Sequence, residues 1–291
     1  MLAGLCSSVC WGLADFLGGV QSRALTVVRV LVISQLAGFT VALAVVLVSH
    51  RAPPAAHYLI IAAAGGVAGL VGLGAFYHAL AVGTMSIVAP ISATGAAVPV
   101  IVGLATGEHP GTVRLVGILT AVAGVVLASR EAGPGEAEVG ATGPGEAEVG
   151  ATRDRSRHQV PLALAAALGF GAFFVAMDRA AHGDVLWALL AARGADVPLL
   201  VGLALLTGTA ISGRPRALVP LIAVGLLDVG ANALYAWATT LGLLSVVAVL
   251  GSLYPVATVL LARGVLGERV RRVQELGIAT VLAGVALIAA G

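Results

Sequence analysis

The sequence predicts an all-α, polytopic membrane protein of ten transmembrane helices, arranged as two inverted repeats of five helices each. Three observations support this prediction: the composition, ten successive apolar runs and an internal similarity between the two halves. The chain has 291 residues, of which 59% are hydrophobic and 10% charged, and its mean hydropathy is +1.04. Because soluble domains carry about 25% charged residues, this composition excludes a soluble globular protein.

The ten apolar runs are bounded by Gly, Pro, Arg or short polar groups. We expect each run to be helical, because lipid offers no hydrogen-bond partner to an open backbone, and about 20 residues are enough to span a bilayer. The first run has no basic flank of the kind that precedes a signal peptide, so we expect it to be retained. The predicted spans are residues 2–20, 25–48, 58–82, 85–106, 113–129, 160–181, 185–208, 217–240, 244–264 and 272–290.

A polar stretch separates the fifth and sixth runs. In this stretch, residues 130–159, the decapeptide GPGEAEVGAT at 133–142 is repeated without change at 143–152. Low hydrophobicity with Gly and Pro is typical of disordered segments. We therefore predict a disordered linker at 130–159 between a first repeat, residues 1–129, and a second repeat, residues 160–291. A regulatory docking site in the linker is the alternative to a tolerated insertion.

The two halves resemble each other in sequence. A shift of 160 positions superposes ten identical residues of the segment 107–127 on the segment 267–287. The similarity continues through Gly83 and Ser86, which match Gly242 and Ser245, and Arg29 has a counterpart in Arg193. Since each half has an odd number of spans, the second half must enter the membrane from the opposite side. Inverted repeats of this kind permit alternating access to a site near the bilayer midplane.

Several motifs resemble those of one known family. They are WG at Trp11 and Gly12, FYHALAVGTMSIVAP at 76–90, SLYPVATVLLARGVLGE at 252–268 and the GxxxxxAGV endings at 117–125 and 277–285. With these motifs the chain resembles the EamA-type transporters of the drug/metabolite transporter superfamily over nearly its whole length outside the linker. The resemblance implies membrane transport of a small molecule, but it indicates no substrate.

The two halves differ in the spacing of their prolines. Pro255 lies thirteen residues before Glu268, whereas Pro99 lies only nine residues before Glu108. Proline removes a backbone hydrogen bond and permits a kink. We therefore expect the fourth and ninth spans to bend at different depths.

The arginines give one prediction of orientation and the resemblance gives another. Eleven arginines lie in the connections after the first, fifth, seventh and ninth spans, and three lie on the other side. Cytoplasmic loops normally hold the excess of basic residues, so this count places both termini outside the cytoplasm. The family resemblance implies cytoplasmic termini. The two predictions disagree, and the orientation stays open.

The eighth span carries a polar stripe. Asp228, Asn232, Tyr235 and Thr239 follow the i, i+4, i+7, i+11 spacing that places them on one helix face. The corresponding positions on the third span include Tyr77. A polar group that contacts substrate need occur in only one repeat, so Asp228 and Asn232 are candidates for lining a central cavity. The alternative is that both join helices by hydrogen bonds.

Span 1 holds a second stripe, in which Asp15 follows Trp11 by four residues. Asp15 is a candidate for binding a substrate amine or a proton. The alternative is that Asp15 pairs with Arg23 or lies near the membrane interface.

Arg29 and Arg193 occupy matching positions in the two halves, and Asp196 lies three residues after Arg193. This spacing brings Asp196 within reach of an ion pair on the same helix. We favour a structural role for these three charges, with a gate that pairs with an acid as the alternative. Glycines at 65, 69, 72, 117 and 124 are expected to let helix backbones approach closely.

The sequence carries none of the common catalytic or nucleotide-binding motifs. It lacks HExxH, GxSxG and GxxxxGK[ST], and it has no His/Cys grouping with metal-ligand spacing. We therefore predict that the protein is not an enzyme, needs no cofactor or metal, and binds no nucleic acid.

The predicted function is secondary transport of a small metabolite or drug-like compound across the plasma membrane. We expect alternating access, efflux, and energy from an ion gradient or exchange, with proton coupling as a possibility. The predicted partners are the substrate and the lipid bilayer; the oligomeric state is not predicted. Asp228 and Asp15 would hold a proton or cationic group, and Trp11, Tyr77, Asn232 and Tyr235 would form the wall. The alternatives are a flippase for a lipid-linked head group and a membrane scaffold without transport activity.

Overall fold

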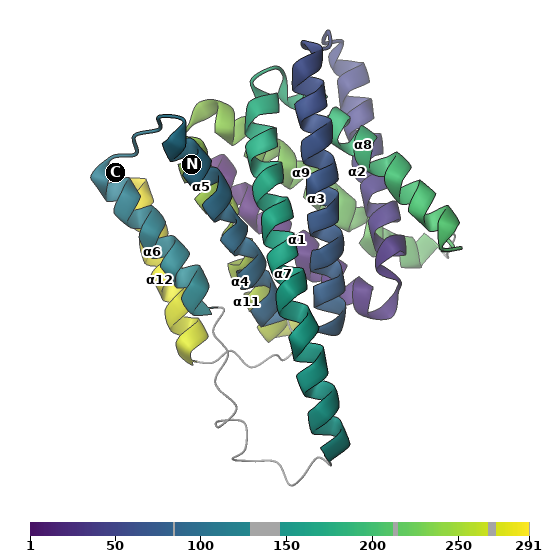
Figure 1. The fold of residues 1–291 in the computed structure, drawn as a ribbon. Coiled ribbons are helices and arrows are strands. Elements are labelled where there is room, and N and C mark those ends of the chain that lie inside the picture. The colour runs from purple at the N-terminus through teal and green to yellow at the C-terminus, as the bar shows by residue number, and fades with distance from the viewer. Residues whose placement is uncertain (84, 129–145, 212–214, 267–271, 291) are drawn as a thin grey trace.

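The structure, a computed structural model, describes residues 1–83, 85–128, 146–211, 215–266 and 272–290. The described residues form helices joined by short connections, without a β-strand (Figure 1). The helices of the first repeat are α1 (Leu2–Ala24), α2 (Val27–Ser49), α3 (Ala56–Val82), α4 (Met85–Ala93), the short 3₁₀ helix η1 (Thr94–Ala96), α5 (Ala97–Ala105) and α6 (Thr112–Ala128). Those of the second repeat are α7 (Glu146–Ala181), α8 (Val185–Leu206), α9 (Pro215–Leu241), α10 (Leu244–Gly251), α11 (Tyr254–Leu266) and α12 (Arg272–Ala290).

These helices match the ten predicted spans. Seven segments of the described chain are long and apolar enough to cross a membrane, and three shorter apolar helices occupy 91–105, 112–124 and 275–288. Two spans are interrupted: η1 separates α4 from α5, and a turn separates α10 from α11. The polytopic all-α fold predicted from composition is therefore confirmed.

One boundary differs from the prediction. The span-length part of α7 begins at Gln159, next to the predicted residue 160, but the helix itself begins earlier, at Glu146. A helix that is already nucleated extends at little cost through good helix formers such as Ala and Glu. The predicted linker at 130–159 lies outside the described residues up to residue 145.

The two repeats run in opposite senses. α6 and α12 are equivalent under the shift of 160 positions, and they pack antiparallel against each other. A Cβ atom on Gly117 would lie 2.7 Å from the backbone nitrogen of Ile288, and one on Gly284 would lie 2.5 Å from that of Ala121. Residues earlier in α6 thus contact residues later in α12, as antiparallel packing requires. Figure 1 shows both chain termini at the same end of the bundle, as an even number of spans requires.

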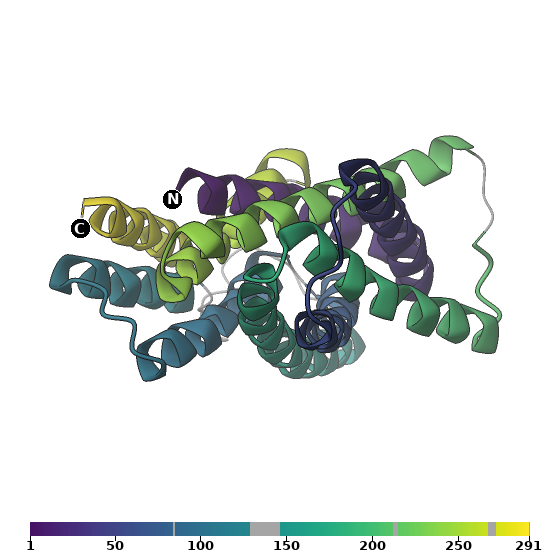
Figure 2. The same ribbon diagram turned by 90° about the horizontal axis from the view of Figure 1, so that it is seen from above.

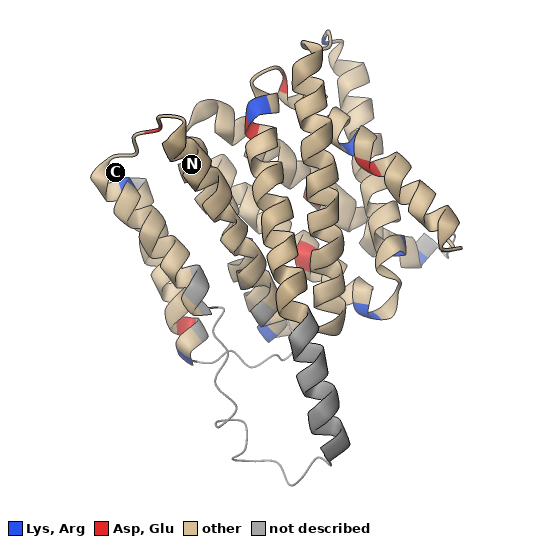
Figure 3. Cartoon of the chain, viewed as in Figure 1, with Lys and Arg blue, Asp and Glu red and all other residues tan. Residues whose placement is uncertain are grey.

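The repeats also interlock. α1 of the first repeat packs along α9 of the second, and α7 of the second packs along α3 of the first. These two pairs are equivalent under the repeat symmetry, and Figure 2 shows them crossing the centre of the molecule. The α3–α7 approach depends on glycine as predicted, since a Cβ on Gly169 would lie 2.7 Å from the Cα of Gly72. Figure 3 shows most charged segments near the helix ends, which is where charges avoid the apolar interior of a bilayer.

The breaks in the fourth and ninth spans contradict one prediction. The first break is at residues 94–96 and the second at 252–253, which are equivalent to within two residues under the match of Gly83 to Gly242. The two spans therefore bend at similar depths. Pro99 lies four residues after Gly95 and has no N–H to donate to the carbonyl of Gly95, so its position is consistent with the first break. The break also lies where Gly95 contacts α7, because a Cβ there would lie 3.0 Å from the Cα of Ala167.

Candidate functional site

A cavity lies between the two repeats, halfway along the helices. It contains about 530 Å³ of space that protein atoms do not fill, part of it open to the outside. α1 and α3 of the first repeat line it, together with α7, α8, α9 and α11 of the second. The lining includes Gly66 and Gly69 of α3, where a Cβ atom would collide with Ala192 of α8 and with Phe173 of α7, so these glycines let the three helices pack closely beside the cavity.

Four of the predicted pathway residues line this cavity: Trp11 and Asp15 of α1, and Asp228 and Asn232 of α9. Asn232 donates from its side-chain nitrogen to the backbone oxygen of Asp228 at 2.7 Å and to a carboxylate oxygen of Asp228 at 3.1 Å. The amide therefore orients the acid and also faces the cavity. Both alternatives weighed for this polar stripe apply to Asp228, which lines the cavity and joins α9 to α8 through Arg193, whereas these hydrogen bonds of Asn232 stay within α9.

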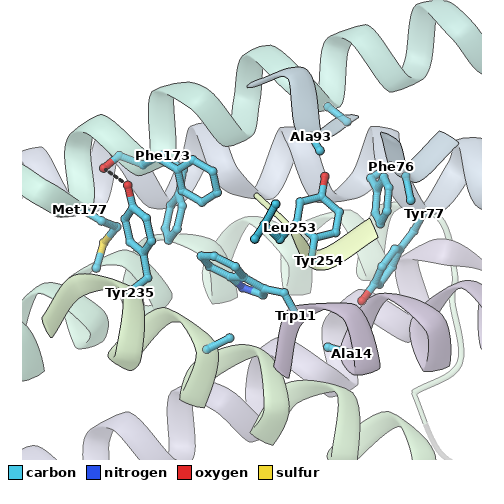
Figure 4. Packing of buried hydrophobic residues seen from close by; sticks show 14 of the residues in the cluster. Trp11, Ala14, Phe76, Tyr77, Ala93, Phe173, Met177, Tyr235, Leu253 and Tyr254 are labelled. Atoms are coloured by element: carbon cyan, nitrogen blue, oxygen red, sulfur yellow. Dashed lines mark hydrogen bonds between the residues drawn. The ribbon is translucent and has the colours of Figure 1, made fainter. Parts of the chain in front are cut away.

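The other two pathway residues lie behind the lining. Tyr235 is fully buried, and its ring stacks on Phe174 with 4.7 Å between ring centroids. Trp11 contacts both rings, at 5.3 Å and 5.6 Å, so Tyr235 supports the wall from outside (Figure 4). Tyr77 is buried against α1, where a side chain on Gly18 would collide with its ring.

Arg193 of α8 is the basic residue of the cavity lining. Its Nη2 atom donates to Asp228 at 2.6 Å, and its Nη1 atom donates to Asp196 at 3.1 Å and to Gln35 of α2. The ion pair expected between Arg193 and Asp196 is thus present. Arg193 binds acids and an amide oxygen, and it joins three helices from both repeats.

The matching arginine of the first repeat has a different position. Arg29 lies near the beginning of α2, is partly buried, and is absent from the described residues that line the cavity. Arg29 is the third residue of α2, whereas Arg193 is the ninth residue of α8. The predicted match between the two arginines is therefore wrong, and Gln35 of α2 is the position that corresponds to Arg193.

Asp15 lies on the side of α1 that lines the cavity. Only 6% of its surface is exposed, and within the described chain its carboxylate has neither a hydrogen bond nor an ion pair. Arg23, the predicted alternative partner, instead donates to the backbone oxygens of Leu80 and Gly83, both at 3.5 Å. Asp15 is thus a buried acid that faces the cavity.

Two residues of functional interest were missed in the sequence. Gln35 binds Arg193, and the one signal for it is a polar pair, Ser34 and Gln35, inside an apolar run. Glu108, between α5 and α6, accepts hydrogen bonds from the backbone nitrogens of Leu244 and Ser245, the second at 3.0 Å. A carboxylate at a helix N-terminus satisfies amides that have no partner within the helix. Glu108 therefore ties the first repeat to the beginning of α10.

The described residues contain no group of three or more His, Cys, Asp or Glu side chains that could hold a metal ion. The arrangement is a largely apolar chamber with two acids, one amide and one engaged arginine at mid-height. Chemically, such a chamber can hold a small organic molecule and compensate a positive charge.

Comparisons with known proteins agree with this architecture. A profile described as "EamA-like transporter family" matches residues 1–130 and 159–290. A protein of known crystal structure is 19% identical, with a TM-score of 0.67 over 98% of this chain and 94% of that chain. At this identity the likeness establishes the fold alone. A search of curated proteins found no match.

Proposed function

Because the chain belongs to the EamA-like transporter family, whose members are membrane transporters, we propose that it is a secondary transporter that works by alternating access. It would move a small metabolite or drug-like compound outward across the plasma membrane. The observation that carries this proposal is the cavity at mid-height between two inverted repeats, lined by both. Inverted repeats can exchange conformations and thereby open such a cavity to either side.

The proposal assigns the moving parts to the two halves of the chain. Residues 1–129 and 160–291 would form the two repeats, and 130–159 would connect them. Asp15 would hold a proton or a cationic group, since a charge at mid-membrane must face protein or water, and Asp228 would keep Arg193 in place beside the cavity. The sequence contains no phosphate-binding GxxxxGK[ST] loop, so transport would draw on an ion gradient or on exchange.

A comparison of exported metabolites tests the proposal. Culture media of a deletion strain and of strains complemented with wild-type protein or Asp228→Asn are compared without preselecting compounds. We expect at least one compound to accumulate with the wild type and not with Asp228→Asn. The matched control, Asp178→Asn, changes an aspartate of α7 outside the cavity and should export as the wild type does.

A vesicle experiment then tests the coupling. The compound is offered to everted vesicles under an imposed pH gradient. Uptake by the wild type, with loss of uptake for Asp228→Asn at equal expression, supports the proposal. A wild-type medium identical to that of the deletion strain, or equal uptake by Asp228→Asn, contradicts it.

A further inference from the structure

The charges of the cavity are not balanced. Arg193 is the one basic residue among the described lining residues, and Asp228, Asp196 and Gln35 already accept hydrogen bonds from it. The negative charge of Asp228 is thereby compensated by Arg193. Asp15 lines the same cavity as Asp228, is 6% exposed, and has no hydrogen-bond or ion-pair partner within the described chain. A buried carboxylate of this kind is unfavourable unless a positive charge or a proton accompanies it.

The rest of the lining determines what can accompany Asp15. Five aromatic residues face the cavity, and Trp11 lies one helical turn before Asp15 on the same face of α1. Aromatic ring faces attract organic cations, and tryptophan does so most strongly. The aromatic residues of the lining are Trp11, Phe170, Phe173, Phe174 and Tyr254.

The same features disfavour other classes of ligand. An anion would be repelled by the two acidic residues of the lining, Asp15 and Asp228. The carboxylate of a zwitterion would need a basic partner, and the positive charge of Arg193 is already compensated by its ion pairs with Asp196 and Asp228. A neutral molecule would supply no positive charge to Asp15, which would then have to be protonated.

We propose that the transported substrate is a monovalent organic cation that carries an aromatic ring, with its cationic group held by Asp15. This inference rests on the proposed function, because it names the substrate class for the same cavity. It also separates the roles of the two acids: Asp15 binds the cation, and Asp228 positions Arg193.

Tryptophan fluorescence provides a binding assay that does not depend on transport. The chain has three tryptophans, at positions 11, 187 and 237. Replacing Trp187 and Trp237 by phenylalanine leaves Trp11 in the cavity wall as the reporter. The full-length protein in detergent is titrated with 2-phenylethyltrimethylammonium, with the neutral 2-phenylethanol and with the anionic 3-phenylpropanoate.

We expect saturable binding that is tightest for the cation. Asp15→Asn should weaken cation binding by about tenfold or more, equivalent to about 1.4 kcal/mol, and leave binding of the neutral probe unchanged, which also shows that the variant is folded. Asp15→Glu should keep the preference for the cation. The matched control Asp178→Asn should bind all three probes as the parent does.

Cation binding that is as tight in Asp15→Asn as in the parent overturns the proposal, as does an anion that binds as tightly as the cation. Failure of the transport proposal would look different. If the cavity opens to both faces of the membrane while the probes show no cation preference, only the substrate class is wrong. If cation binding depends on Asp15 while the cavity opens to one face only, the substrate class stands and alternating access is wrong.

Discussion

Arg193 and Asp228 form an ion pair between helices α8 and α9, with 2.6 Å between Nη2 and Oδ2. Only 8% of the arginine side chain and 14% of the aspartate side chain are exposed. The same guanidinium binds Gln35 of α2, so this contact joins both repeats beside the cavity. A pair at this position fixes the relative placement of three helices, and it leaves Asp15 as the uncompensated acid of the lining.

Removing the arginine should destabilise the protein strongly. Arg193→Ala leaves Asp228 and Asp196 buried without their cation, which costs about 3–5 kcal/mol. The measurement is the free energy of unfolding from a denaturant titration in mixed micelles. The control Arg51→Ala breaks an ion pair with Asp184 whose arginine side chain is 59% exposed, and it should cost less than about 1 kcal/mol. Equal costs for the two variants would show that the buried pair has no structural role.

Glu108 should stabilise the contact between the repeats at the beginning of α10. Glu108→Ala leaves the amides of Leu244 and Ser245 without their acceptor, and loss of a helix cap costs about 0.5–2 kcal/mol. Glu108→Gln keeps one acceptor oxygen and should cost less. Thermal unfolding in detergent ranks the variants. Glu275→Ala is the control, because its ion pair with Arg263 is about half exposed. A Glu108→Ala midpoint no lower than the control's contradicts the capping role.

Gly117 should tolerate no side chain where α6 crosses α12. In Gly117→Ala, the new methyl group would lie 2.7 Å from the nitrogen of Ile288 and 2.8 Å from the oxygen of Gly284. Both atoms are backbone, so the helices must separate, and overpacking of this kind costs about 1–3 kcal/mol. Gly202 of α8 has no atom within 4 Å of a built Cβ, so Gly202→Ala should be neutral or stabilising. Unfolding titrations compare the two, and a Gly117→Ala variant as stable as Gly202→Ala would refute the close crossing.

Much of the fold was predictable because membrane helices must be apolar, continuous and of a minimum length. The predicted run 25–48 became α2 at Val27–Ser49, and 272–290 became α12 with the same bounds. The inverted arrangement followed from counting spans in two similar halves. The position of the first helix break was not predicted, although Pro99 removes the helical hydrogen bond to Gly95, because the contact of Gly95 with α7 depends on packing between the repeats.

The sequence predicted several residues that line the site, but not how these residues pair with others. Helical spacing placed Asp228 with Asn232 and Trp11 with Asp15, and the structure brings all four to one cavity. Spacing along one helix cannot show which helix lies opposite. The ion pair between Arg193 and Asp228 and the hydrogen bond from Arg193 to Gln35 could not be predicted, because they depend on how α2, α8 and α9 pack together.

Access to Leu70 tests the central claim, alternating access, most directly. Leu70 of α3 faces the cavity, and the two native cysteines, Cys6 and Cys10, can be replaced by alanine to give a background for Leu70→Cys. Sealed vesicles of both orientations are treated with a membrane-impermeant thiol reagent. The control Leu206→Cys, at the end of α8 and 88% exposed, should react from one face only. The account predicts that Leu70→Cys reacts from both faces; reaction from a single face under every imposed gradient, or no reaction at all, would contradict it.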